Sequence, residues 1–260
     1  MRFSASFSAK LLTAVIPLSI LFSAPTQARD WNVIKDSGTI IAATEGAFAP
    51  FNYFEGDKLT GYEVDVGEAI AAKLGLKIEW HAVPFDAEVP AINQDRYDFA
   101  IASHGYTDER AKAVDFADPH YCTGGQIAAP KGGPLTAAAL KGKTVGVQLA
   151  TSYASEAKKI PGIKNLKTYK SDPDAFSALK AKKIEAWISD KFTILETLKK
   201  NPGTNIVTGD LIFKERVSLI MRKDNKEFMD KINATLAELT KDGTLAKISQ
   251  KYFGQDITCK

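Results

Sequence analysis

The sequence has little of the chemistry that metal and nucleic-acid sites require. Only three of its 260 residues are histidines, and His81, His104 and His120 do not follow the spacing of metal ligands. The 34 Lys and Arg residues nearly balance the 31 Asp and Glu residues, and no basic run is present. We therefore expect no metal, no cofactor, and neither nucleic acid nor an anionic membrane surface as the main partner.

A long apolar run occurs at the start of the chain. Residues 11–22 are apolar, Arg2 and Lys10 precede them, and small residues follow up to Ala28. This pattern is typical of a secretory signal peptide, so we expect residues 1–28 to be cleaved after Ala28 and the rest to be exported to the periplasm as a soluble protein. Without Arg2 and Lys10 the net charge falls from +3 to about +1.

Cysteine is nearly absent as well. Cys122 and Cys259 are the two cysteines in the chain. No cysteine stands directly after the apolar run, which argues against a lipid anchor at the mature N-terminus. In an oxidising compartment an even pair favours one disulfide, and two buried free thiols are the alternative.

Apolar strands alternate with helical patterns through the rest of the chain. We expect strands over 39–43, 78–82, 99–102, 127–129, 145–149, 166–169, 186–189 and 219–221. Helical patterns cover 64–74, 87–93, 152–159, 174–181, 192–199, 225–241 and 245–252. This alternation predicts an α/β architecture with mostly parallel sheets, in which ligands bind at the carboxyl ends of strands.

Two breaks in the alternation predict two lobes. The first contains Gly124 and Gly125, and the second is a short extended segment near 214–217. Residues 30–121 and 218–260 would form one lobe and 125–213 the other, with crossings near 122–124 and 214–217. A chain that crosses twice makes a hinge, with a cleft between the lobes.

Three predicted strand ends carry groups for a zwitterion. Arg110 lies one turn inside a helix that Thr107 caps, so it adds a fork-shaped cation to unpaired backbone amides. Thr151 and Ser152 open a second helix, and Asp190 ends a third strand. Together they would bind the carboxylate and the ammonium of an α-amino acid. The alternatives are a surface arginine and two ordinary helix caps.

The end of the strand expected over 39–43 adds candidates for a side-chain pocket. Glu45, Phe48 and Phe51 follow the strand over 39–43, and Phe85 follows the next strand. Aromatic faces on two sides can enclose a flat or aliphatic group, whereas plain core packing is the alternative, above all for Phe51.

Six segments, in this order, resemble the polar amino acid solute-binding proteins of ABC importers. They are residues 43–51 (ATEGAFAPF), 61–66 (GYEVDV), 107–119 (TDERAKAVDFADP), 140–147 (LKGKTVGV), 242–244 (DGT) and 251–254 (KYFG). The resemblance covers the chain beyond the signal peptide. It implies the two-lobed type II periplasmic-binding-protein fold with a two-strand hinge, no catalysis, and delivery of an amino acid to a permease in the inner membrane. We expect a monomer.

The resemblance also implies roles for single residues. Arg110 and the main chain at Ser152 match the positions that hold the ligand carboxylate, and Asp190 with the Ser103 carbonyl match those that hold the ammonium. The side-chain pocket and its rim would be formed by Glu45, Phe48, Phe85, Gln148, Thr151 and Tyr153.

The chain departs from the family pattern beside the ammonium site. Gly105 stands where a Ser or Thr hydroxyl usually helps to hold the ammonium, so one polar contact is lost and space is opened. His104 or Tyr106 could supply the missing bond, and a structural role is the alternative for His104.

Glu45 bears on the identity of the ligand. An acid in the pocket suits the cationic end of Arg, Lys, ornithine or His, and it also accepts hydrogen bonds from a glutamine amide. The alternative function is a dehydratase of cyclohexadienyl acids on the same scaffold. Its general acid would come from Glu45, His104 or Glu156, which show no diagnostic spacing.

Overall fold

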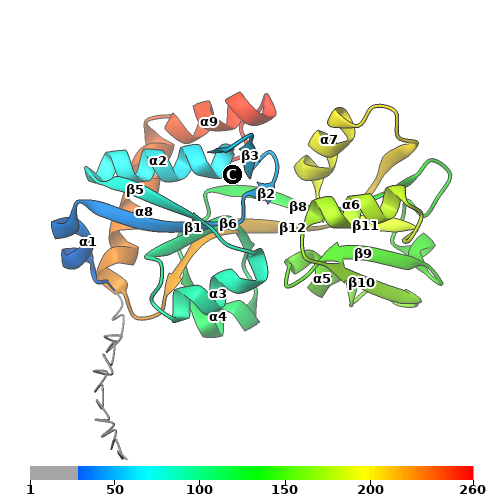
Figure 1. Cartoon of the computed structure of the whole chain (residues 1–260), viewed down its shortest axis with the longest axis horizontal. Helices are drawn as coiled ribbons and strands as arrows, with labels where there is room; N and C mark the ends of the chain where they lie inside the picture. The colour runs from blue at the N-terminus through cyan, green and yellow to red at the C-terminus, as the bar shows by residue number, and fades with distance from the viewer. Residues whose placement is uncertain (1–28, 260) are drawn as a thin grey trace, which may run out of the picture.

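Two neighbouring strands run through the whole molecule and organise the fold. The computed structural model describes residues 29–259, so the predicted signal peptide lies outside the described residues. β8 (Tyr121–Pro130) and β12 (Ile206–Arg222) pair antiparallel along almost all of β8. Figure 1 shows them passing between two groups of helices, one at each end.

A mixed sheet extends outwards from this central pair. Its order is β10-β9-β11-β8-β12-β6-β1-β5, and β7 (Val114–Phe116) pairs with β12. On one side lie β6 (Phe99–Gly105), β1 (Thr39–Thr44) and β5 (Lys77–Ala82), and on the other β11 (Ala186–Asp190), β9 (Thr144–Gln148) and β10 (Asn165–Tyr169). The outer pairs are parallel and the crossing pairs antiparallel.

Helices cover the two halves of the sheet. The first group consists of α1 (Trp31–Ser37), α2 (Tyr62–Leu74), α3 (Phe85–Asn93), α4 (Asp108–Ala113), α8 (Lys226–Lys241) and α9 (Thr244–Phe253). The second group consists of α5 (Ser152–Ala157), α6 (Asp172–Lys180) and α7 (Lys191–Lys200), and Figure 1 shows it around the far end of the sheet. A short 3₁₀ turn covers Ala138–Leu140. Within residues 29–259, no helix has the length and apolar character to cross a membrane.

Buried strands and capped helices follow from the local sequence. Every residue of β6 is buried, as expected for a near-continuous apolar strand that is covered on both faces. Thr107, Thr151 and Asp190 cap α4, α5 and α7 through their side-chain oxygens. Each of these caps therefore fixes a strand end to the start of a helix, where ligands of α/β proteins bind.

A glycine pair allows the two central strands to approach closely. A Cβ on Gly124 would lie 2.2 Å from the Phe213 carbonyl oxygen, and one on Gly125 would lie 2.1 Å from the Phe213 ring. Only glycine fits at such a distance. The glycines that predicted a crossing therefore permit the pairing of β8 with β12.

Two of the predicted strands are shorter than the strands in the structure. The strand expected over 219–221 is the end of the 17-residue β12, and the strand expected over 127–129 belongs to a β8 that begins at Tyr121. A small separate sheet of β2 (Ala47–Phe48), β3 (Asn52–Glu55) and β4 (Lys58–Thr60) was not predicted. The lobe boundaries proposed above stay a prediction.

The two cysteines form the predicted disulfide. Cys122 in β8 is bonded to Cys259, 137 residues further along the chain. The backbone N–H of Cys122 also donates to the carbonyl oxygen of Ile257 at 2.9 Å. The end of the chain is thus tied to one of the two crossing strands.

Candidate functional site

Most of the predicted ligand-binding residues line one enclosed cavity. It lies between the two helix groups, and its volume is about 10 Å³. The residues that line it are Glu45, Phe48, Phe85, Ala102, Ser103, Gln148, Thr151, Ser152 and Tyr153. They come from three separate strand ends and from two helices, so the fold brings together positions far apart in the sequence.

A hydrogen bond joins the two sides of this cavity. Gln148, at the end of β9, donates from Nε2 to Glu45 Oε1 at 2.6 Å, and Glu45 follows β1. A volume of about 10 Å³ is that of a single water. An amino acid therefore needs the two sides to move apart, which the two crossing strands would permit by bending.

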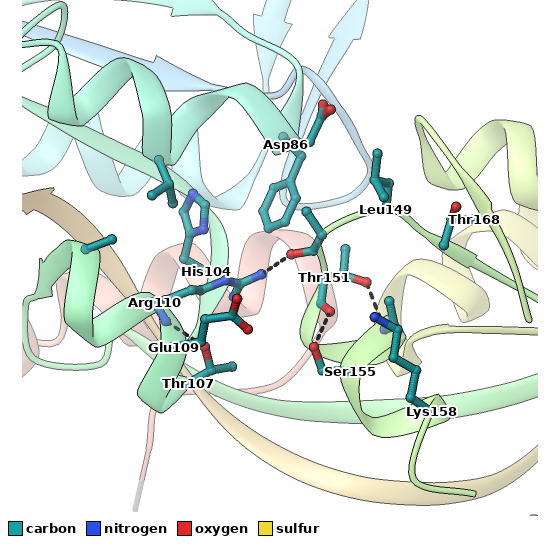
Figure 2. Close-up of a pocket in the computed structure, with 15 residues that line it drawn as sticks. Asp86, His104, Thr107, Glu109, Arg110, Leu149, Thr151, Ser155, Lys158 and Thr168 are labelled. Atoms are coloured by element: carbon teal, nitrogen blue, oxygen red, sulfur yellow. Dashed lines mark hydrogen bonds between the residues drawn. The ribbon is translucent and has the colours of Figure 1, made fainter.

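A larger cleft of about 400 Å³ adjoins the enclosed cavity. Phe85 and Thr151 line both spaces, and Arg110 and His104 line the cleft. Figure 2 shows Arg110 and His104 on one side of it and Thr151, Ser155 and Lys158 on the other. Arg110 thus lines the cleft and not the enclosed cavity, and Phe85 and Thr151 are the residues that the two spaces share.

The Arg110 guanidinium bridges the two sides of the cleft. Nη1 donates to the Gly105 carbonyl at 2.7 Å and Nη2 to the Ala150 carbonyl at 2.6 Å, while the guanidinium lies over the Phe85 ring, 5.3 Å from its centroid. Burial lowers the pKa of Arg110. Among residues 29–259 no carboxylate lies within 4 Å of it as an ion pair. A partly buried cation held only by carbonyls is suited to receive an anion.

Two residues at the site adopt the left-handed backbone conformation without being glycine. Ser103 has a φ of 60° and Ala150 a φ of 61°. Such backbone strain costs on the order of 1–3 kcal/mol and is often found at ligand sites. The Ala150 carbonyl is one of the two that accept from Arg110, so this conformation contributes directly to the site.

A buried carboxylate holds Ser103 in place. Glu63 Oε1 accepts from Ser103 N at 2.8 Å and from His120 Nε2 at 3.0 Å, and Oε2 accepts from Ser103 Oγ at 2.9 Å and from Asn52 Nδ2 at 2.8 Å. Asn52 Oδ1 in turn accepts from Gly46 N, next to Glu45. The Glu63 network therefore positions two sides of the cavity, and nothing in the sequence pattern indicated it.

Replacing Glu63 by glutamine tests this network. The variant Glu63→Gln turns one acceptor into a donor that faces other donors, so we expect the free energy of unfolding to fall by about 3 kcal/mol. Urea unfolding measures the loss. Glu79→Gln is the matched control, because Glu79 forms a pair with His81 at 2.8 Å on the surface and should cost less than about 1 kcal/mol. Equal losses in the two variants would contradict the role given to Glu63.

Asp190 is fully buried at the end of β11. Its Oδ1 accepts from Phe192 N at 2.7 Å and from Thr193 N at 3.2 Å, and its Oδ2 accepts from Thr123 Oγ1. Burial raises the pKa of Asp190 to about 7. Asp190 thus acts as a helix cap, its Oδ2 faces the crossing strand β8, and it lines neither the enclosed cavity nor the adjoining cleft.

His104 has a buried acidic partner. Its Nε2 lies 2.6 Å from Glu88 Oε2 in α3, and its ring stacks on Phe85 with the centroids 4.7 Å apart. Burial raises the pKa of Glu88 and lowers that of His104, so both are neutral and Glu88 donates the proton in this hydrogen bond. The predicted ligand residue His104 therefore supports Phe85 from behind, and its ring lines the cleft rather than the enclosed cavity.

Phe51 is a core residue. It is fully buried and stacks on Tyr121 and Phe48 with centroids 4.7 Å and 5.5 Å away. Phe48 is the one of these three that also lines the cavity. The core alternative is therefore the correct one for Phe51.

Glu215 is a functional candidate that the sequence analysis missed. It lies in β12, and its Oε2 accepts from Ser152 Oγ at 2.6 Å. In the sequence it stands between Lys214 and Arg216, a charged pattern that is typical of solvent exposure. Among the residues from 29 to 259, no group of three or more His, Cys, Asp or Glu could hold a metal ion.

The chain matches the model of the bacterial extracellular solute-binding proteins, family 3, over residues 40–255. It is 34% identical over 233 residues to the L-cystine-binding protein TcyJ of Escherichia coli (strain K12), covering 87% of each chain. It also resembles an ancestral arginine-binding protein, solved with arginine and with glutamine, at 36% identity, with a TM-score of 0.80 and coverage of 84% of this chain and 99% of that one.

A third similar structure bears on the dehydratase alternative. It is the ancestral amino acid-binding protein AncCDT-1, a precursor of cyclohexadienyl dehydratase, at 27% identity, with a TM-score of 0.80 and coverage of 85% of this chain and 98% of that one. The scaffold alone therefore does not exclude an enzyme. The matches confirm the predicted fold and solute-binding role, and the chain belongs to the bacterial extracellular solute-binding proteins of family 3.

Proposed function

We propose that this protein is the periplasmic substrate-binding component of an ABC importer, and that it captures a polar or cationic α-amino acid between its two lobes. The observation that carries the proposal is the position of Arg110, which has no carboxylate ion pair among residues 29–259 and lines a cleft that shares Phe85 and Thr151 with the cavity lined by Glu45. The ligand carboxylate would bind Arg110 and Ser152, and its ammonium would bind near Asp190. After closure the loaded protein, a monomer, passes the amino acid to a permease in the inner membrane.

Binding without catalysis fits the contacts of the three candidate acids. His104 is hydrogen-bonded to Glu88, Glu156 to Lys159 at 2.5 Å, and Glu45 to Gln148. A dehydratase needs a general acid poised next to a leaving hydroxyl, usually with a second group that tunes it. These three side chains have separate partners, which favours the binding function.

A thermal-shift screen tests the proposal. The mature protein is unfolded, dialysed and refolded to remove any bound solute, then heated with each of the twenty amino acids, ornithine, citrulline, cystine and prephenate. A ligand at 100 times its Kd should add about 2.7 kcal/mol of stability. We expect a shift from Arg, Lys, ornithine, His, Gln or cystine. No shift from any α-amino acid, together with turnover of prephenate, would contradict the proposal.

The pH dependence of binding tests the role of Glu45. Burial, and to a smaller extent the neighbouring carboxylate of Asp172, raise the pKa of Glu45 to about 8. A cationic ligand side chain binds the ionised form, so its affinity should rise as the pH increases from 6 to 8, by up to about 50-fold, because the ionised fraction rises from about 1% to about half. Calorimetry with L-arginine measures this.

Glu45→Gln provides the control for that prediction. It keeps an acceptor for the Gln148 amide but removes the titration, so the variant should lose most of the pH dependence. The part that remains would come from Asp190, whose pKa of about 7 lies in the same range. The same pH profile in wild type and variant would show that Glu45 does not contact the ligand cation.

A further inference from the structure

Glu215 carries a buried carboxylate oxygen, Oε1, that forms no hydrogen bond of normal geometry within residues 29–259. Oε2 accepts from Ser152 Oγ, whereas Oε1 is buried and has no hydrogen-bond partner within the described residues. The buried Tyr153 hydroxyl is close enough to Glu215 to act as a weak donor to its carboxylate, although the contact does not have the geometry of a full hydrogen bond. Burial raises the pKa of Glu215. Among the described residues Glu215 Oε1 thus has only a weak donor, and it can accept a stronger hydrogen bond from a ligand.

Gly105 makes room for this carboxylate. A Cβ at Gly105 would lie 2.0 Å from Glu215 Oε2 and 3.3 Å from Ser152 Oγ. Gly105 pairs with Val217 of β12, two residues from Glu215, so the two positions are diagonal neighbours on adjacent strands. The carboxylate therefore occupies the space into which a side chain at position 105 would project.

Glu215 also lies beside Asp190. In the β8–β12 register Glu215 is directly opposite Thr123, and the Thr123 hydroxyl donates to Asp190 Oδ2. The negative charge of Glu215 contributes to the raised pKa of Asp190. Two carboxylates thus approach one place from β11 and β12, with Arg110 as the nearby cation whose charge favours ionised Glu215.

We propose that Glu215 is a specificity-determining residue that, with Asp190, accepts hydrogen bonds from the protonated amino group of the bound amino acid. This rests on the proposed function and narrows its ligand class to α-amino acids with a free, positively charged amino group. The Glu215 carboxylate stands where the family usually has a Ser or Thr hydroxyl, so it adds a negative charge beside the ligand amino group. The 2-hydroxy acid analogue, which lacks the ammonium, should therefore bind much more weakly than the amino acid.

The test compares amino acids with their hydroxy analogues. Wild type and Glu215→Gln are titrated calorimetrically with L-arginine, L-lysine, L-glutamine and L-cystine, and the tightest binder is then compared with its 2-hydroxy acid. We expect Glu215→Gln to weaken the amino acid about 10- to 100-fold and to change the affinity for the hydroxy acid less than about threefold. Glu156→Gln is the matched control, because Glu156 is close to Glu215 but pairs with Lys159, and it should change neither affinity.

Each other outcome has a distinct meaning. Equal weakening of both probes would mean that Glu215 acts only on the shape of the site and would overturn the inference. Tighter binding of the amino acid by Glu215→Gln would show that the carboxylate competes for Ser152, which also overturns it. If wild type binds none of the four amino acids, the proposed function is overturned as well. A thermal melt of the unliganded variant confirms that it is folded, since removal of a buried charge should not destabilise it.

Discussion

The variant Arg110→Ala is expected to lose amino acid binding, with a Kd at least about 100-fold higher than that of wild type. Among the described residues that line the cleft, Arg110 is the one arginine, so only its guanidinium can pair with the ligand carboxylate in a fork geometry. Without it that carboxylate would be buried unpaired. Calorimetry with the tightest amino acid of the screen measures the loss. Arg110→Lys keeps a point charge and should give an intermediate Kd.

A surface arginine controls for the loss of charge. Arg96 is exposed and lies over the Tyr97 ring, 5.5 Å from its centroid. Arg96→Ala should change the Kd less than about twofold, because charges far from the ligand are screened by salt. Unchanged affinity of Arg110→Ala would contradict the assignment of the carboxylate site.

Removal of the disulfide is expected to cause the largest loss of stability. The bond closes a loop of 137 residues and joins the chain end to the crossing strand β8. Loss of such a link costs about 2–5 kcal/mol, which corresponds to a fall in Tm of roughly 5–15 °C for a chain of this size. The double variant Cys122→Ser with Cys259→Ser, melted beside oxidised wild type, measures it.

Reduction of the wild-type protein separates the bond from the substitutions. Wild type in a strong reductant should melt at the same temperature as the double serine variant, and its free thiol count should rise from zero to two. Two free thiols in native exported protein, or a Tm that does not respond to reduction, would contradict the bond.

Short-range signals in the sequence were enough to predict most of the strand ends and helix starts that line the cavity. Thr107 and Thr151 are strong caps that follow apolar strands, so the helix starts and the carboxyl ends of the strands could be predicted together. Parallel strands bring such ends to one edge, which predicted Glu45 at the site, whereas Ser103 and Gln148 were expected there from the family resemblance. Asp30 and Gly38 also give cap signals that would have predicted α1.

Long-range geometry could not be predicted in the same way. The left-handed backbone of Ser103 is accompanied by two hydrogen bonds to Glu63, which comes from a helix 40 residues earlier. The sequence around Glu215 predicts a surface residue. The pairing of β12 with β6 and β8 instead places its carboxylate beside Gly105. Likewise the hydrogen bond of His104 to Glu88 of α3 appears only once the two elements pack together. These contacts arise from packing, for which the local pattern has no signal.

A crystal structure of the mature protein with the tightest amino acid of the screen tests the central claim most directly. The account predicts one ligand in an enlarged cavity between the lobes, with its carboxylate on Arg110 and Ser152 and its amino group between Asp190 and Glu215. A ligand bound elsewhere, or bound in this cavity with the amino group turned away from both carboxylates, would contradict it.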